Sequence, residues 1–421
     1  MKKIFKIILS AVIILGLSAC NEEFLELAPI TYANESDFFK TDSDFEAAIT
    51  SIYGTMGGTF VMLPWRMQFR GDNLKFWNYV YMELSTNQLS PNATSFIWSM
   101  YGSLVFPTNN ILEKLENAEG ISEEVKKTVS GEALFFRGYA YYWFHLGFGR
   151  VPLVTSVITS DEALEVGLSD KELVLAQAIA DFEKAASLLP ATSPVFGKLD
   201  KYVAMSFQAK ALMLQNNWGK AATVLQDVYN NSGHELEPVW TDMWTTEAEK
   251  TSKEFMFQKI YNELSTAPGQ QFLYIRGDNT TQITFEYKPG LMDSFEDGDI
   301  RRDATLGFDE DGLALNNKYD FGKVENLWTF DVQILRFTDV QLLYAEAISM
   351  AAGSVQQQSL DLINEVRNRA GLDDITMVDV PDLNAFVEVV LDERRHEFVF
   401  EGQRYPDLKR HGLLVQKLNA I

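Results

Sequence analysis

Apolar residues recur at helical spacing along most of the chain, and this pattern restricts the possible folds more than any other feature of the sequence. Within residues 45–52, apolar side chains occupy positions i, i+3, i+4 and i+7, which gives a helix one continuous apolar face. Ser43 with Glu46, and Ser169 with Glu172, have the spacing of capping boxes. The chain is therefore expected to be mainly α-helical, with further helices over 122–144, 169–189, 198–215, from 218 onward, 340–351, 356–369 and 383–400.

The links between paired helices are short, as at Asn216-Asn217, and alanines lie where neighbouring helices would pack closely. These features are typical of stacked helical hairpins of tetratricopeptide type. No strict repeat period is visible, so the hairpins are expected to be degenerate.

Two stretches, 57–97 and 232–335, interrupt the helical pattern with glycines, prolines and turn signals. The second contains strand-like pieces at Phe255–Tyr261 and Gln282–Tyr287. Long irregular insertions in a helical scaffold are where binding surfaces usually lie. Residues 20–421 are thus predicted to form one unit, with a helical scaffold over about 36–56, 98–231 and 336–412 and variable, partly β ligand-binding insertions over about 57–97 and 232–335.

The N-terminus has the features of a leader that is removed at residue 19. A lysine-rich start precedes an apolar run over 7–17, which is too short to cross a bilayer core that needs roughly 20 residues. The run ends in Leu-Ser-Ala before Cys20, which resembles a bacterial lipobox and implies a lipid on the Cys20 sulfur. An ordinary leader that ends near a cysteine is the alternative. Asn21-Glu22-Glu23 resembles the export signal of Bacteroidota surface lipoproteins.

The charge balance and the cysteine count exclude several kinds of protein. Cys20 is the only cysteine, so an internal disulfide and a zinc site of several thiolates are excluded. The net charge is −23, and removal of the three leader lysines makes it −26. Nucleic-acid binding rests on a basic surface, so no nucleic-acid partner is expected. Membrane association would depend on acyl chains, because charge alone would not attract this chain to anionic lipid.

Four longer strings resemble, in the family's order, the motifs of SusD/RagB-like nutrient-uptake lipoproteins of Bacteroidota. They are EALFFRGYAYY leading into LGFGRVPLV (132–154), RFTDVQLLYAEA (336–347), LINEVRNRAGL (362–372) and ERRHEFVFEGQRYPDLKR (393–410).

The resemblance implies a SusD-like, mainly helical fold with tetratricopeptide-type hairpins and a variable ligand-binding part. It also implies an outer-membrane lipoprotein, exposed at the cell surface, that captures oligosaccharides, or peptides in some members, for a SusC-like TonB-dependent transporter. Ligand residues vary in this family, so none is carried over. Trp240 and Trp244 resemble family positions that pack beneath the inserted region, and the charged residues of 393–410 are expected to form a structural ion network.

Aromatic residues are concentrated in residues 60–106. A carbohydrate platform needs flat aromatic faces beside amides, carboxylates or arginine. Trp77, Tyr79 and Tyr81 alternate, so in an extended segment their rings would lie on one side, with Asn78 between them. A strand that packs these rings onto the helices would show the same pattern.

The second insertion, 232–335, also combines aromatic rings with hydrogen-bonding groups, namely Tyr274, Arg276, Asp278, Asn279 and Tyr287. Trp98, Tyr101 and Phe106 are assigned to the core, and a core position is favoured for Trp65. The candidate ligand-binding residues are Trp77, Tyr79, Tyr81, Trp65, Asn78, Tyr274, Arg276, Asn279 and Trp328.

Little in the sequence supports catalysis. The four histidines are scattered, and neither a metalloprotease motif, a nucleophile elbow nor a phosphate-binding loop occurs. The acidic turns at 295–299 and 309–312 resemble calcium loops but lack the complete ligand spacing. We therefore expect a binding protein that is not an enzyme, with no cofactor beyond the lipid on Cys20, although calcium stays possible. A peptide-binding member of the family and a surface lipoprotein glycosidase are the alternatives.

Overall fold

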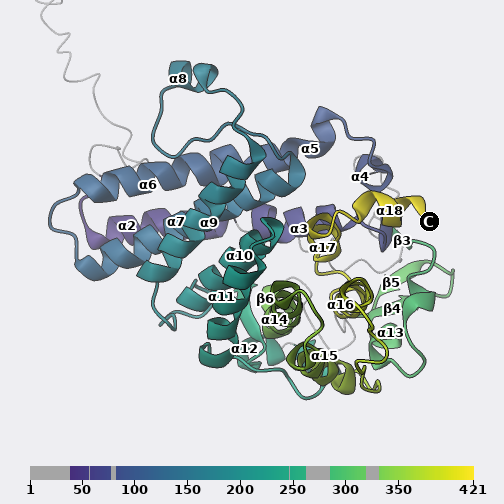
Figure 1. The fold of residues 1–421 in the computed structure, drawn as a ribbon. Helices are drawn as coiled ribbons and strands as arrows, with labels where there is room; N and C mark the ends of the chain where they lie inside the picture. The colour runs from purple at the N-terminus through teal and green to yellow at the C-terminus, as the bar shows by residue number, and fades with distance from the viewer. Residues whose placement is uncertain (1–37, 56, 77–81, 246, 262–284, 319–330) are drawn as a thin grey trace, which may run out of the picture.

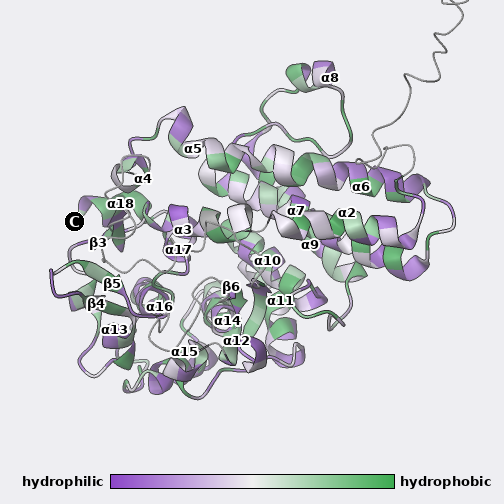
Figure 2. Ribbon diagram, turned by 180° about the vertical axis from the view of Figure 1, so that it is seen from behind, coloured by the Kyte–Doolittle hydropathy of each residue, from purple (hydrophilic) through white to green (hydrophobic). Residues whose placement is uncertain are grey.

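The computed structural model describes residues 38–55, 57–76, 82–245, 247–261, 285–318 and 331–421 (Figure 1). Long helices occupy one side of the molecule, and the short strands β3, β4 and β5 lie at the opposite side from helix α2 (Figures 1 and 2). The prediction of a mainly helical fold with few strands is confirmed.

The scaffold is a series of helices in which each long helix packs on the next, from α7 through α9, α10, α11 and α14 to α15. This order of packing is that of degenerate helical hairpins. The bounds are α2 Asp42–Gly54, η3 Tyr101–Val105, α6 Phe106–Asn117, α7 Glu123–Gly147, α8 Ser160–Glu165, α9 Lys171–Leu188, α10 Lys201–Leu214, α11 Trp218–Asn231, α14 Phe337–Ala352, α15 Gln357–Arg369, α16 Leu383–Glu397, α17 Arg404–Arg410 and α18 Leu414–Asn419.

Local capping signals explain where several scaffold helices begin. Helix α2 starts after Thr41, which forms a capping box with Asp44, two residues earlier in the chain than the box expected at Ser43. The side chain of Ser122 caps α7 by accepting from the backbone N–H of Val125. The box expected at Ser169 is absent, because α9 begins after Asp170.

Helices α7 and α9 approach closely at a glycine. A Cβ at Gly138 would lie 3.1 Å from Cβ of Asp181 and 3.2 Å from the carbonyl oxygen of Ala178. Beside this contact, the guanidinium group of Arg137 donates to both carboxylate oxygens of Asp181 at 2.9 and 2.7 Å. The absence of a side chain at residue 138 thus lets a buried ion pair join the two helices.

The two insertions contain short elements of both kinds. The described residues of the first insertion, 57–76 and 82–97, form mostly short helices, whereas the sequence predicted irregular structure there, because helices of this length are too short to establish a period. The bounds are η2 Gly57–Val61, α3 Met62–Gln68, β1 Leu74–Phe76, α4 Met82–Thr86, α5 Pro91–Trp98, η4 Trp240–Met243, α12 Ala248–Thr251, β2 Phe255–Lys259, β3 Phe285–Tyr287, η6 Met292–Ser294, α13 Ile300–Thr305, β4 Leu306–Phe308, β5 Ala314–Asn316 and β6 Val332–Arg336.

The described strands form three antiparallel pairs, β1 with β3, β2 with β6, and β4 with β5. In the first pair, Leu74 lies opposite Tyr287 and Phe76 lies opposite Phe285. The β2–β6 pair joins the start of α14 to the second insertion and contains register shifts near Phe257. The strand-like pieces expected near 255 and 285 are therefore present as β2 and β3.

A second hydrophobic core, separate from that of the scaffold, lies beneath the two insertions. Trp65, Phe69 and Phe76 from the first insertion pack in the same cluster as Trp240 and Trp244 from the second. Trp240 and Trp244 are both buried, as the family resemblance implied. The two insertions therefore form one body.

Buried ion pairs hold this body against the C-terminal helices. Glu397 of α16 is the centre of the network, and burial alone would raise its pKa. The surrounding guanidinium groups outweigh that effect and hold the pKa of Glu397 well below its usual range. The expected ion network is thus confirmed, and its donors to Glu397 are Arg369 at 2.7 Å, Arg336 at 3.0 Å, the indole of Trp240 at 3.1 Å and Arg301 at 3.2 Å.

Among the residues that the structure describes, none of the helices combines the length and the apolar character needed to span a bilayer.

Candidate functional site

Most residues predicted to contact a ligand lie outside the described residues. These are Trp77, Asn78, Tyr79, Tyr81, Tyr274, Arg276, Asn279 and Trp328, together with the lipid-attachment residue Cys20. Their roles stay predictions.

Trp65 is the one candidate whose position is described. It is 3% exposed and belongs to the second core. Its ring meets Phe69 and Phe76 edge-on, with centroids 4.9 and 5.5 Å apart. In this conformation Trp65 supports the insertions from below and offers no face to a ligand at the surface.

The described residues that border the predicted ligand segments lie together. Phe76 directly precedes residues 77–81 and is the cross-strand partner of Phe285, which directly follows residues 262–284. Similarly, the backbone N–H of Tyr261 donates to a carboxylate oxygen of Asp331 at 2.7 Å. The chain thus enters or leaves these segments at two paired positions, both on the second core.

A groove with about 490 Å³ of free volume begins at the first of these positions. Strand β3 lines it on one side, and the β4–β5 hairpin lines it on the other. This volume lies within the range of about 300–1,000 Å³ that is common for small-molecule sites.

Tyr287 provides a rigid ring on the β3 side of the groove. Its hydroxyl accepts from the backbone N–H of Gly307 at 3.0 Å and lies within donating distance of the carbonyl oxygens of Gly307 and Leu315. Burial raises the pKa of Tyr287 to about 12, so the phenol stays neutral. These contacts fix the ring orientation before any ligand arrives, which reduces the entropy lost on binding.

Phe308 provides a second, exposed ring in the groove. It stands edge-on to Tyr287 with centroids 5.4 Å apart and is 55% exposed. The exposed residues Glu286 and Asp293 also line the groove, and the carboxylate of Glu286 lies 4.0 Å from Nζ of Lys75 on the paired strand. Two rings beside carboxylates can bind a ligand that has both apolar C–H faces and hydroxyl groups.

The other polar residues at this position have structural partners. Nζ of Lys288 donates to the carbonyl oxygen of Gly71 at 2.7 Å, and burial lowers the pKa of Lys288 to about 8. Arg404 binds both carboxylate oxygens of Asp72 at 2.7 and 2.8 Å, and Arg395 donates to Asn73. Asp72 and Asn73 thus anchor strand β1.

Three carboxylates of the acidic turns considered for calcium have partners within the protein. Glu296 pairs with Arg367, Asp299 pairs with Arg301, and Asp309 accepts from two backbone N–H groups of its own turn. Within the described part of the chain, no group of three or more metal-ligating side chains occurs.

A second aromatic cluster lies at the surface where α5, α6 and α7 meet. Trp98 is 47% exposed and contacts the half-exposed ring of Phe148 at a centroid distance of 5.9 Å. Phe106 is also exposed, whereas Tyr101 is buried. The assignment of Trp98 and Phe106 to the core is therefore wrong, because neighbouring helices leave the outer faces of both rings uncovered.

Phe308 was missed by the sequence reasoning. The available signal was its position directly before the turn at 309–312, where the hairpin holds it at the surface. The sequence indicates its partner Tyr287 only as part of a mixed polar and aromatic stretch. Nothing local indicated that the two rings would meet.

Comparison with known proteins gives two matches to family models. Residues 23–213 match the family described as "Starch-binding associating with outer membrane", and residues 326–421 match the SusD family.

Whole-chain relatives and solved structures agree with these matches. SusD-like protein P25 of Formosa agariphila is 23% identical over 100% of this chain and 92% of its own. A SusD superfamily protein of Bacteroides vulgatus has the same fold, with a TM-score of 0.79 and 24% identity over 91% of each chain. A laminarin binding SusD-like protein matches with a TM-score of 0.74 and 22% identity over 90% of this chain and 94% of its own. The chain belongs to the SusD/RagB-like proteins.

Proposed function

We propose that this chain is a cell-surface lipoprotein that binds an oligosaccharide or polysaccharide and delivers it to a SusC-like TonB-dependent transporter in the outer membrane. The observation that carries the proposal is the groove in which the fixed ring of Tyr287 and the exposed ring of Phe308 lie beside carboxylates. This combination suits a sugar, which presents C–H faces to aromatic rings and hydroxyls to acceptors.

The position of the groove supports the same ligand class. Phe285, which lines the groove, is the cross-strand partner of Phe76. Phe76 directly precedes the predicted platform of Trp77, Tyr79 and Tyr81 in the sequence. Among the relatives, one matched family is described as starch-binding and one matched structure as laminarin binding.

The proposed activity is ligand binding without catalysis, so the protein is proposed not to be an enzyme. Binding to a glycan panel is the direct test, and calorimetry with the purified protein should give a saturable signal with at least one oligosaccharide. A matched panel of peptides tests the alternative ligand class. Shortened glycan products in the same samples would instead support a glycosidase.

A triple substitution tests the predicted platform. Alanine at Trp77, Tyr79 and Tyr81 together should abolish glycan binding while helicity and melting temperature are retained. Unchanged affinity in this triple variant would reject those residues as the site and leave the groove of Tyr287 and Phe308 as the binding surface.

Attachment to the outer membrane is assigned to a lipid on Cys20, because several acyl chains anchor a protein stably where a single chain does not. Mass spectrometry of the N-terminal peptide should show an acylated cysteine. An unmodified Cys20 would contradict the anchor but not the glycan site.

For the transporter, the exposed aromatic cluster of Trp98, Phe106 and Phe148 is the proposed docking face. Contiguous exposed apolar surface on a soluble domain often marks a protein interface. In Figure 1 helix α5, which ends at Trp98, lies apart from the β4–β5 hairpin that lines the groove, so both surfaces could be used together.

A further inference from the structure

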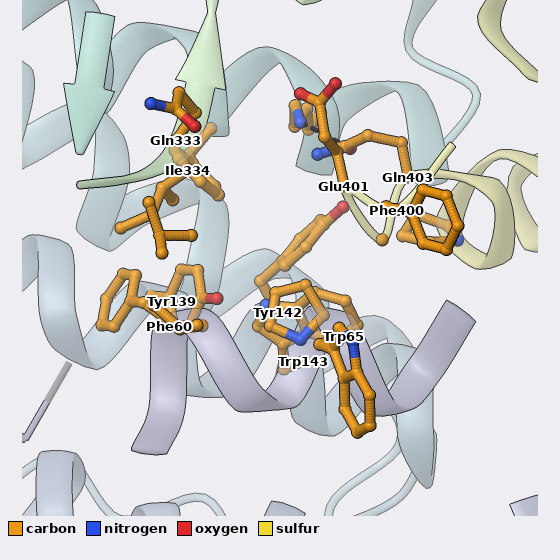
Figure 3. A pocket seen from close by; sticks show the side chains of 17 residues that line it. Phe60, Trp65, Tyr139, Tyr142, Trp143, Gln333, Ile334, Phe400, Glu401 and Gln403 are labelled. Atoms are coloured by element: carbon orange, nitrogen blue, oxygen red, sulfur yellow. Dashed lines mark hydrogen bonds between the residues drawn. The ribbon is translucent and has the colours of Figure 1, made fainter. Parts of the chain in front are cut away.

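A small internal cavity lies where the helical scaffold meets strand β6 (Figure 3). Helices α7 and α10 supply one part of its wall, and η2, α3, β6 and residues 400–406 supply the rest. The wall is mostly aromatic, but it also carries polar atoms from both the scaffold and the insertions.

Three buried polar atoms on this wall have no hydrogen-bonding partner among the described residues. They are the hydroxyl oxygen of Tyr139, the indole nitrogen of Trp143 and the amide oxygen of Gln333. Tyr139 is 1% exposed, and Tyr139 and Gln333 lie on different walls of the cavity (Figure 3). Burial raises the pKa of Tyr139 well above its usual value, and an interaction of its hydroxyl with the indole of Trp143, which does not have the geometry of a normal hydrogen bond, opposes this rise only in part.

The charged groups at the cavity are already balanced within the protein. Lys210 pairs with the carboxylate of Asp339 and donates to the side-chain oxygen of Gln403 at 3.1 Å. The carboxylate of Glu401 accepts from Arg336 at 2.8 and 2.9 Å. A neutral hydrogen-bonding molecule therefore suits this cavity better than an ion.

The size of the cavity further limits which molecule could occupy it. It leaves about 40 Å³ for the centres of water-sized molecules, and one ordered water needs about 10–15 Å³ on that measure. Two or three waters would fit, whereas a sugar ring would not. Polar cavities of this kind hold waters that satisfy buried groups, while cavities that stay dry are apolar.

We propose that this cavity is an internal water-binding site, in which two or three ordered waters connect Tyr139 and Trp143 of the scaffold to Gln333 of β6. The amide nitrogen of Gln333 already donates to the carbonyl oxygen of Asp331 at 3.0 Å. The waters extend this network to α7 and make the scaffold and the β2–β6 pair one hydrogen-bonded unit.

The sign of a stability change distinguishes a hydrated cavity from a dry one. In a hydrated cavity, Tyr139→Phe removes hydrogen bonds and lowers the melting temperature. In a dry cavity, where the hydroxyl has at most its interaction with the indole of Trp143, the same change leaves the melting temperature unchanged or raises it. Tyr141→Phe is the matched control on the same helix, because the hydroxyl of Tyr141 bonds both the N–H and the carbonyl oxygen of Val154 at 2.8 and 2.7 Å. That control should lower the melting temperature in either case.

A crystal structure that shows ordered solvent is the second measurement. Water within hydrogen-bonding distance of the Tyr139 hydroxyl and of the Gln333 amide oxygen is the expected result. Xenon bound in the cavity, a direct bond between the two side chains, or an unchanged or higher melting temperature for Tyr139→Phe would overturn the proposal.

Discussion

Phe76 and Phe285 are cross-strand partners, although they come from two separate insertions into the helical scaffold. Each borders a segment that the sequence predicts to contact ligand, and the groove lined by Tyr287 and Phe308 begins at the same strand pair. This pairing is the structural reason for assigning the strand region, and not the outer face of the scaffold, to ligand binding.

The exposed ring of Phe308 should contribute to glycan affinity without contributing much to stability. An aromatic contact is worth about 0.5–1.5 kcal/mol beyond area burial, so Phe308→Ala should weaken binding by about 2- to 10-fold. Calorimetry with a bound glycan measures the effect. Phe196→Ala, which removes another exposed phenylalanine of the scaffold, is the control and should leave affinity unchanged.

Removal of the charge on Glu397 should destabilise the fold severely. The carboxylate is fully buried among Arg301, Arg336 and Arg369, so Glu397→Gln leaves these cations without their shared partner. Breaking a buried pair in this way costs about 3–5 kcal/mol in the free energy of unfolding. Chemical denaturation should show this loss.

The control for that variant is an exposed ion pair. Glu183→Gln removes the partner of Lys220 at the surface and should cost no more than about 1 kcal/mol. Equal effects of the two substitutions would contradict the central position of Glu397 in the network.

Asp331 should make stability depend on pH near neutrality. Burial raises its pKa from 3.8 to about 7, and the neighbouring Glu249 adds to the rise. The folded protein therefore keeps a proton that the unfolded chain releases, so this group lowers the free energy of unfolding as pH rises from about 4 to about 7.

The variant Asp331→Asn removes this titration and can still accept from the N–H of Tyr261. Its stability relative to the unmodified protein should increase across that pH range, as measured by melting temperature. Asp161→Asn, at an exposed position of α8, should show no such trend. A constant difference between Asp331→Asn and the unmodified protein would reject the raised pKa.

The aromatic surface around Trp98 should affect transporter association but not ligand affinity. Trp98→Ala removes the most exposed ring of the cluster and should reduce co-purification with a SusC-like protein from outer membranes. Its glycan affinity should stay unchanged, whereas Phe308→Ala should show the reverse. Undiminished co-purification would place the docking face elsewhere.

Several features of the fold could be predicted because they depend on neighbouring residues. The apolar spacing at 45–52 places Phe45, Ile49 and Ile52 on the buried face of α2. Helices α11 (Trp218–Asn231), α15 (Gln357–Arg369) and α16 (Leu383–Glu397) also follow the predicted segments. The side chains of a helix return to the same face every three to four residues, so a short stretch of sequence is enough to identify its buried face.

The candidate site could be predicted only in part. Sequence reasoning identified the two insertions, but it did not find Phe308 and placed Trp98 and Phe106 in the core. The exposure of a ring depends on which distant element covers it, and the spacing of residues along the chain does not contain that information.

The sequence by itself determined the mainly helical scaffold, the family and the stretches that interrupt the helices, because periodicity and motifs are local properties. Only the tertiary structure decided that Phe76 meets Phe285, that Tyr287 is fixed by Gly307, and that Tyr139 and Gln333 share a cavity. Those contacts join residues far apart in the chain, and they form only when the second core and the buried ion pairs bring the insertions onto the scaffold.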